Sequence, residues 1–316
     1  MPPKLLGIHH VTALAKDPSK NIRFYRDVLG MRFIKNTINF DDPGTYHFYF
    51  ADRVGTPGSV FTTFPHPHAG LGRKGAGEVS TTMLAIPEGS AGYWKARLAE
   101  HGIKDIREVG GGDRPVTIEF EDHDSMALAL VERADDNAPL GFEFWEDGPV
   151  GREHAIRRID GVRLRVRDVA PSRELLTDAM GFAVESEEDG GLSLTLGEGG
   201  SSQRLELVAD PDAPRARMGA GSIHHVAWRV ADDGDHLAMQ RRLMDAGVGV
   251  TEVKERYYFR SIYFREPGGV IFEIATDGPG FTVDEDEASL GTSLRLPPMY
   301  EGNRKIIEQA LPEVKA

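Results

Sequence analysis

The chain of 316 residues contains no cysteine, no apolar run long enough to cross a membrane and no basic stripe. Without cysteine there are no disulfides, thiolate zinc sites, iron–sulfur clusters or cysteine nucleophiles, so a metal must be bound by His, Asp, Glu, Tyr or backbone oxygen. The formal charge of -13 comes from acidic residues spread along the chain, which disfavours nucleic acid and anionic membrane as partners. The N-terminal MPPKLLGI lacks the features of a signal peptide, and we therefore expect a cytoplasmic protein.

A paired histidine stands twice at the head of a strand-like stretch, in IHHVTAL from Ile8 and in IHHVAWR from Ile223. Both stretches open a unit that reads strand, helix and three strands, and this pattern occurs four times. A glycine ends each predicted helix; the four are Gly30, Gly102, Gly181 and Gly247. We therefore predict an α+β fold of four βαβββ modules forming two open barrel-like sheets. The modules are predicted at 1–68, 78–134, 154–210 and 221–277, followed by a tail and helix at 278–316.

Strand alternation predicts which side chains meet when two modules pair. Each module contributes one inward position on its first strand and one on its last strand. Aligning the Pro-Gly turns at Pro57 and Pro267 gives the last-strand positions. The eight inward candidates are then His10 and Thr63, Thr81 and Ala129, Gly161 and Glu206, and His225 and Glu273.

Modules one and four thus supply His10, His225 and Glu273, whereas modules two and three supply one carboxylate and no imidazole. Two histidines and a carboxylate with open positions form the facial triad of non-haem Fe(II) oxygenases. We expect Fe(II), with Mn(II) as the alternative ion, and no organic cofactor. Thr63 at the fourth position is a poor ligand, which argues against a glyoxalase-type isomerase. Glu273 also lies in the apolar run VIFEIA, where a carboxylate is costly unless it is paired or binds a metal.

Other polar groups have simpler interpretations. Alternation turns His9 and His224 away from the metal, so a structural or supporting role is expected for both. His66 and His68 are spaced to chelate at i and i+2, but a solvated linker is the simpler interpretation. The acidic run DEDE at 284–287 is most simply a solvated turn.

The whole chain resembles the vicinal oxygen chelate superfamily of glyoxalases, bleomycin-resistance proteins and extradiol dioxygenases. It looks most like the ring-cleaving hydroquinone dioxygenases typified by 2,6-dichlorohydroquinone dioxygenase. The matching segments are GIHHVT, YHFYFADRVGTPGSVFTTFP, IHHVAW, YFRSIYFREPGGVIFEIATD and GFTVDEDEASLG. The resemblance implies iron bound by the three residues named above. It also implies supporting or substrate-facing roles for His9, Thr12, His224, Arg256 and Tyr263.

The resemblance further implies an oxidoreductase that cleaves the ring of a hydroquinone or related diphenol and incorporates both atoms of O₂. The expected partners are the diphenol, O₂ and further copies of the chain in a homo-oligomer, without nucleic acid or membrane. Two alternatives stay open. A metal-dependent lyase, isomerase or thiol transferase of the glyoxalase type would not need O₂, and a ligand-sequestering resistance protein would not need a metal.

Overall fold

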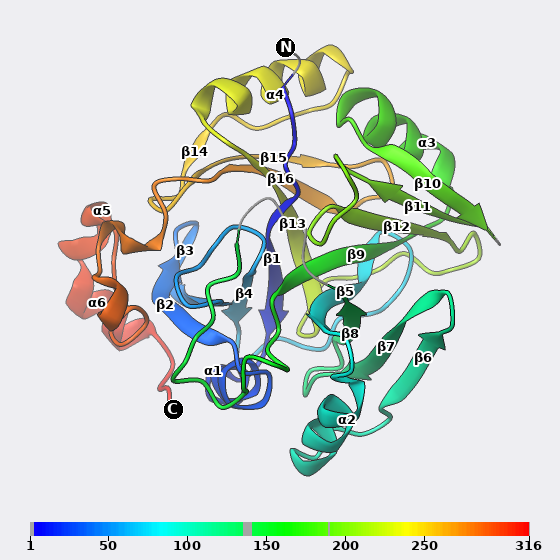
Figure 1. The fold of residues 1–316 in the computed structure, drawn as a ribbon. Coiled ribbons are helices and arrows are strands. Elements are labelled where there is room, and N and C mark those ends of the chain that lie inside the picture. Colours follow the sequence, from blue (N-terminus) through cyan, green and yellow to red (C-terminus); the bar gives the residue numbers. More distant parts are fainter. Residues whose placement is uncertain (1–2, 135–140, 189, 316) are drawn as a thin grey trace.

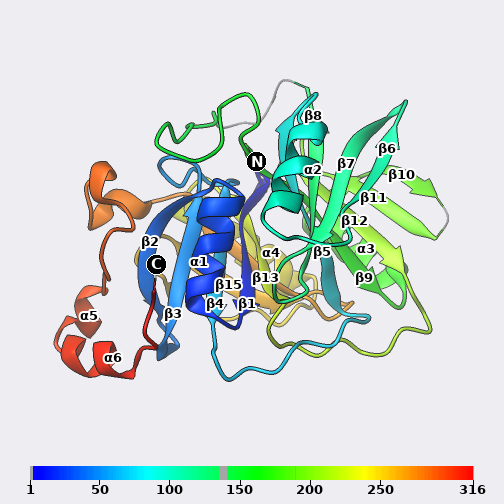
Figure 2. The same cartoon turned by 90° about the horizontal axis from the view of Figure 1, so that it is seen from below.

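Two curled sheets lie side by side in the computed structural model, which describes residues 3–134, 141–188 and 190–315 (Figures 1 and 2). The first sheet has the strand order β14-β15-β16-β13-β1-β4-β3-β2, and the second has the order β10-β11-β12-β9-β5-β8-β7-β6. Modules one and four therefore share one eight-stranded sheet, and modules two and three share the other. This arrangement confirms the predicted fold class.

Each module contributes four strands and a helix. The first contains β1 (Ile8–Ala15), α1 (Pro18–Ile22), a π-helical turn (Arg23–Val28), β2 (Arg32–Asn39), β3 (Asp42–Ala51) and β4 (Val60–Pro65). The second contains β5 (Glu78–Pro87), α2 (Ala91–Glu100), β6 (Arg107–Gly111), β7 (Arg114–Glu121) and β8 (Ala127–Arg133). The third contains β9 (Arg158–Val166), α3 (Val169–Glu174), a second π-helical turn (Leu175–Ala179), β10 (Ala183–Glu188), β11 (Gly191–Thr195) and β12 (Arg204–Ala209). The fourth contains β13 (Ser222–Val230), α4 (Asp233–Asp245), β14 (Lys254–Glu255), β15 (Arg260–Arg265) and β16 (Ile271–Thr276).

The module helices begin and end at the residues that local chemistry favours. Asp17 caps the N-terminus of α1 by accepting a hydrogen bond from the backbone N–H of Lys20 at 2.9 Å. The closing glycines adopt the left-handed conformation that β-carbons disfavour, with φ of 72° at Gly30 and 78° at Gly247. Helix α1 covers β3 and β4 (Figure 2). In the π-helical turn that follows α1, Tyr25 stacks on Phe61 of β4 with ring centroids 4.7 Å apart. Among the described residues, no helix is both long and apolar enough to cross a membrane.

The strand register brings polar side chains into one row on the inner face of the first sheet. His10 on β1 is paired with Ala227 on β13, Ala227 with Glu273 on β16, and Glu273 with Tyr263 on β15. His225 lies two residues before Ala227 and therefore points to the same face. The small side chain of Ala227 leaves space between His10 and Glu273. These four neighbouring strands run together through the centre of Figure 1.

The C-terminal tail closes the open side of the first sheet. Two of its side chains join a core cluster inside the curl: Phe281 in a 3-10 turn (Phe281–Val283), and Leu290 directly after a second one (Glu287–Ser289). Helices α5 (Pro298–Glu301) and α6 (Arg304–Ala310) then pack beside β2 and β3, at the left of Figure 1. The tail thus follows β16 at one side of the sheet and ends beside the strands at the other side.

The prediction that residues 284–287 form a solvated turn is wrong for the first two acids. Lys35, fully buried on β2, donates to Asp284 at 2.7 Å and to Glu285, whose carboxylate is also buried. The ammonium group lies 5.0 Å from the ring centre of Tyr258. Because burial of unpaired charges is strongly unfavourable, these acids are buried only together with the lysine.

Candidate metal centre and substrate cavity

The structure brings His10, His225 and Glu273 together at one buried point. Nε2 of His10 lies 3.3 Å from Nε2 of His225 and 3.4 Å from Oε2 of Glu273. Nε2 of His225 lies 2.9 Å from the same carboxylate oxygen. The three side chains are the one group within the described residues whose His, Asp or Glu ligand atoms gather closely enough for a metal ion.

The spacing of these atoms fits a metal ion better than mutual hydrogen bonds. Oε2 of Glu273 is buried without a properly aligned hydrogen-bond donor, although both imidazoles are near it. Ligand bonds of about 2.1 Å that meet at roughly 90–110° would place their donor atoms about 3.0–3.4 Å apart, close to the observed separations. Imidazole and carboxylate donors suit iron and manganese. The residues present therefore fit a divalent transition metal.

Neighbouring side chains hold the three donors in place. Nδ1 of His9 lies 2.9 Å from Nδ1 of His10, and Nδ1 of His224 lies 2.8 Å from Nδ1 of His225. With both Nε2 lone pairs directed at the site, Nδ1 of each candidate ligand carries the proton and donates it to its neighbour. The other oxygen of Glu273 accepts a short hydrogen bond from the Ser261 hydroxyl. The repeated His-His pair therefore combines one candidate ligand with one orienting group.

Electrostatics favour the protonation states that a metal requires. Burial alone would raise the pKa of Glu273, but the imidazoles of His10 and His225 outweigh it and hold the pKa well below its ordinary range. Burial lowers the pKa of His225, and it also lowers the pKa of His224, to about 3. At neutral pH the carboxylate is therefore ionised and His225 and His224 are neutral, as metal binding requires.

A cavity of about 200 Å³ opens on the three donors. Of the other predicted site residues, His224, Arg256 and Tyr263 line it, whereas His9 and Thr12 lie in the layer behind. Nε of Arg256 donates to the hydroxyl of Tyr263 at 3.0 Å, and the guanidinium lies over the tyrosine ring. An apolar cavity of about 150 Å³ can bind benzene, so the present volume suits a single substituted ring.

The interpretation of His66 as part of a solvated linker is wrong, because His66 belongs to the wall of the cavity. His66 is half-buried and lines the cavity, although His68 is exposed as expected. His66 directly follows β4, which places it beside Phe64 at the opening. The strand before it, more than the surrounding proline and glycine residues, decides its position.

The structure also corrects the position that corresponds to Glu273 in module one. Strand β1 pairs His10 with Val60 and Thr12 with Thr62, whereas β13 pairs His225 with Ile271 and Ala227 with Glu273. The counterpart of Glu273 is therefore Thr62, one residue before the predicted Thr63. Thr63 faces the opposite side of β4 and donates to Oδ1 of Asn21 on α1 at 2.6 Å.

His47 is a cavity residue that the sequence analysis missed. Its Nε2 lies 2.9 Å from the hydroxyl of Thr62, and its Nδ1 lies 2.9 Å from the hydroxyl of Tyr49. Thr62 in turn donates to Thr12 at 2.7 Å. Burial lowers the pKa of His47 well below its ordinary value, so the ring is neutral. A histidine at the inward alternation of the aromatic run TYHFYFA was the signal available in the sequence.

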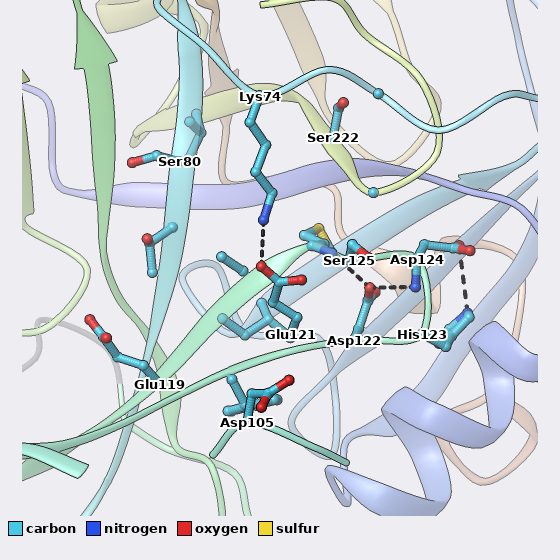
Figure 3. Close-up of a pocket in the computed structure, with 18 of the residues that line it drawn as sticks. Lys74, Ser80, Asp105, Glu119, Glu121, Asp122, His123, Asp124, Ser125 and Ser222 are labelled. Atoms are coloured by element: carbon cyan, nitrogen blue, oxygen red, sulfur yellow. Dashed lines mark hydrogen bonds and ion pairs between the residues drawn. The ribbon is translucent and has the colours of Figure 1, made fainter. Parts of the chain in front are cut away.

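The second sheet places an ion pair where the first sheet places the candidate metal donors. Glu206, the counterpart of Glu273, accepts a hydrogen bond at 2.6 Å from Nε of Arg163 on β9. A wide cleft nearby contains a Lys74–Glu121 ion pair and the turn of Asp122, His123 and Asp124 (Figure 3). The Asp122 carboxylate accepts backbone N–H groups of Asp124 and Met126 at 2.8 and 2.9 Å. The carboxylates of Glu206, Glu121 and Asp122 therefore already have donors.

The chain belongs to the Glyoxalase/Bleomycin resistance protein/Dioxygenase superfamily, which its residues 7–130 and 158–274 match. The predicted superfamily membership is therefore confirmed.

Full-length relatives agree with this assignment. The chain is 40% identical to the Bacillus subtilis protein named "Putative ring-cleaving dioxygenase MhqO", over 98% of this chain and 97% of the relative. It is 30% identical to a "Chlorohydroquinone/hydroquinone 1,2-dioxygenase" of Sphingobium indicum, over 96% of this chain and 94% of the relative. A crystal structure titled as a putative dioxygenase from B. subtilis superimposes with a TM-score of 0.92 at 38% identity, covering 99% of this chain and 98% of that one.

Proposed function

We propose that the protein is an Fe(II)-dependent ring-cleaving dioxygenase that acts on hydroquinone or a related single-ring diphenol with O₂. The observation that carries the proposal is the buried arrangement of His10, His225 and Glu273 on one side of a ring-sized cavity. The names of the full-length relatives support the predicted enzyme class, an oxidoreductase of the dioxygenase type. The proposed choice of iron and of a hydroquinone goes beyond this class.

Iron held by the three donors would supply one-electron chemistry with O₂ and lower the pKa of a coordinated phenol hydroxyl. The surrounding side chains would orient the ring through hydrogen bonds. The Tyr263 hydroxyl, held by Arg256, offers a hydrogen bond beside Glu273. Nδ1 of His224 accepts the hydrogen bond from His225, so in the neutral ring Nε2 carries the proton and can donate a hydrogen bond to a substrate oxygen.

His9 and Thr12 serve this proposal as positioning residues. His9 holds the ring of His10 through the two Nδ1 atoms and packs against Phe259. Thr12 joins the hydrogen-bonded chain that leads through Thr62 to His47. Both are buried, so their effect on catalysis would pass through the groups that they hold.

The test is to measure bound iron and O₂ uptake on a panel of hydroquinones and catechols. Uptake with one O₂ consumed per ring opened, together with its loss in Glu273→Gln, is the expected result. Glu273→Gln keeps the shape of the side chain and removes the anionic donor. Iron-loaded protein that takes up no O₂ with any diphenol would overturn the proposal.

The same preparations separate the alternatives. A glyoxalase-type lyase would remain active under anaerobic conditions. A sequestering protein would bind its aromatic ligand equally well after His10→Ala, because it needs no metal.

A further inference from the structure

The rim of the substrate cavity carries an ion pair between two distant parts of the chain. Asp41, in the loop between β2 and β3, accepts a hydrogen bond at 2.7 Å from Nη2 of Arg256, which follows β14. Both residues line the cavity. The Arg256 side chain is 16% exposed and the Asp41 side chain 67% exposed, so the guanidinium belongs to the wall and the carboxylate to the solvent side.

The loop that carries Asp41 is held in position on both sides. The backbone N–H of Asp41 donates to Oδ1 of Asn39 at 3.0 Å. The carbonyl of Phe40 accepts a hydrogen bond at 2.6 Å from the hydroxyl of Tyr300 on α5. The carboxylate therefore faces Arg256 because of a fixed loop, and helix α5 contributes to this placement.

Arg256 is the one arginine or lysine among the described residues that line the cavity. A guanidinium in a cavity wall is a strong binding group for carboxylates, because its planar N–H groups match two carboxylate oxygens. Here Nε is occupied by Tyr263 and Nη2 by Asp41. A ring carboxylate that paired with the Nε–Nη2 edge would have to displace Asp41, and one that paired with Nη1 would lie beside the negative charge of Asp41.

We propose that Asp41 determines substrate specificity by neutralising Arg256, so that the cavity accepts uncharged diphenols and rejects diphenols with a carboxylate on the ring. The inference rests on the proposed function and adds the substrate class. Asp41→Asn would free the guanidinium for a carboxylated ring. Since Asp41 is largely solvated, we expect a change of about tenfold in selectivity, the lower end for a charge-assisted hydrogen bond.

The experiment compares hydroquinone with 2,5-dihydroxybenzoate, the same ring with a carboxylate added. Iron-loaded protein is assayed by O₂ uptake, and the ratio of kcat/KM for the acid to that for hydroquinone is determined. Asp41→Asn should raise this ratio about tenfold, with a gain that shrinks as salt is added. Asp42→Asn is the matched control, because it removes the same charge from the next residue. The Asp42 carboxylate accepts a hydrogen bond from the Thr45 hydroxyl and none from Arg256.

Two further measurements keep the inference separate from the proposed function. Dissociation constants of both compounds are measured by calorimetry on the iron-loaded protein without O₂, where the same shift in their ratio is expected. If the wild type cleaves no diphenol of the panel, the proposed function fails and the binding ratio alone decides on Asp41. Asp41→Glu, which keeps the charge, should retain wild-type selectivity. An unchanged ratio in Asp41→Asn, or an equal change in Asp42→Asn, would overturn the inference.

Discussion

Replacing Lys35 with Met should destabilise the protein far more than the loss of an ordinary surface lysine. The ammonium group is fully buried and serves both Asp284 and Glu285. Removing one partner from a buried ion pair typically costs about 3–5 kcal/mol, because the remaining charge stays desolvated. The Lys35→Met side chain fills a similar volume, so the change isolates the loss of charge from the loss of packing.

Two contacts that survive the substitution place the expected cost near the lower end of that range. The Tyr258 hydroxyl still donates a hydrogen bond to Asp284 at 3.0 Å, and Nε of Arg295 still lies 2.9 Å from a carboxylate oxygen of Glu285. We therefore expect the free energy of unfolding to fall by about 3 kcal/mol. Adding Glu285→Gln to Lys35→Met should recover part of this loss, since it removes the carboxylate that the first change leaves unbalanced.

The assay is urea unfolding followed by circular dichroism at neutral pH, with Lys95→Met as the control. Lys95 on α2 pairs with Glu108, but both side chains are nearly half exposed, so its loss should cost under about 1 kcal/mol. If Lys35→Met and Lys95→Met have equal effects, the buried cluster does not stabilise the closure of the first sheet by the tail. Equal destabilisation in Lys35→Met and in the double variant would refute the charge argument specifically.

Three further outcomes are expected. Thr62→Glu places a carboxylate on the cavity side and should change the visible spectrum of the Co(II)-loaded protein. Thr63→Glu buries an unpaired charge against α1 and should lower the yield of folded protein; the reverse pattern would contradict the strand register. His47→Phe should retain iron but lower the free energy of unfolding by about 1–3 kcal/mol, because the buried hydroxyls of Thr62 and Tyr49 lose their partner. Loss of iron, measured by elemental analysis, would show instead that His47 helps to bind the metal. Burial raises the pKa of Asp122 from 3.8 to about 6, so the stability associated with its proton is lost as pH rises between these values. Asp122→Asn, which keeps an oxygen acceptor, should gain up to about 3 kcal/mol relative to wild type from pH 4 to pH 7 in urea titrations, and a pH-independent difference would disprove this.

The fold class was accessible from the sequence because it depends on local patterns that recur. Alternating strands, capped helices and closing glycines are each encoded within a few residues, and four copies make the pattern hard to mistake. The candidate metal donors were accessible for a related reason. His10 and His225 occupy equivalent places in two modules, and Glu273 interrupts an apolar strand, where a carboxylate needs a partner.

The register of the last strand of module one shows where such reasoning fails. In module one, the residue paired with His10 is Val60. In module four, the residue paired with His225 is Ile271, which lies one position further from Pro267 than Val60 lies from Pro57. Aligning the two Pro-Gly pairs therefore displaces the count by one. Because side chains alternate along a strand, a slip of one residue moves a side chain to the opposite face, from Thr62 to Thr63.

The sequence by itself determined the modules, the sheet class and the three side chains that meet at the candidate metal centre, since each follows from periodicity and repetition. Only the tertiary structure decided that Lys35 is buried with two acids of the tail, that His47 and His66 reach the cavity and that Asp41 covers Arg256. These contacts join segments that the chain keeps far apart, up to 250 residues for Lys35 and Glu285. Whether a charged or polar side chain is buried or solvated depends on the partner that folding brings to it.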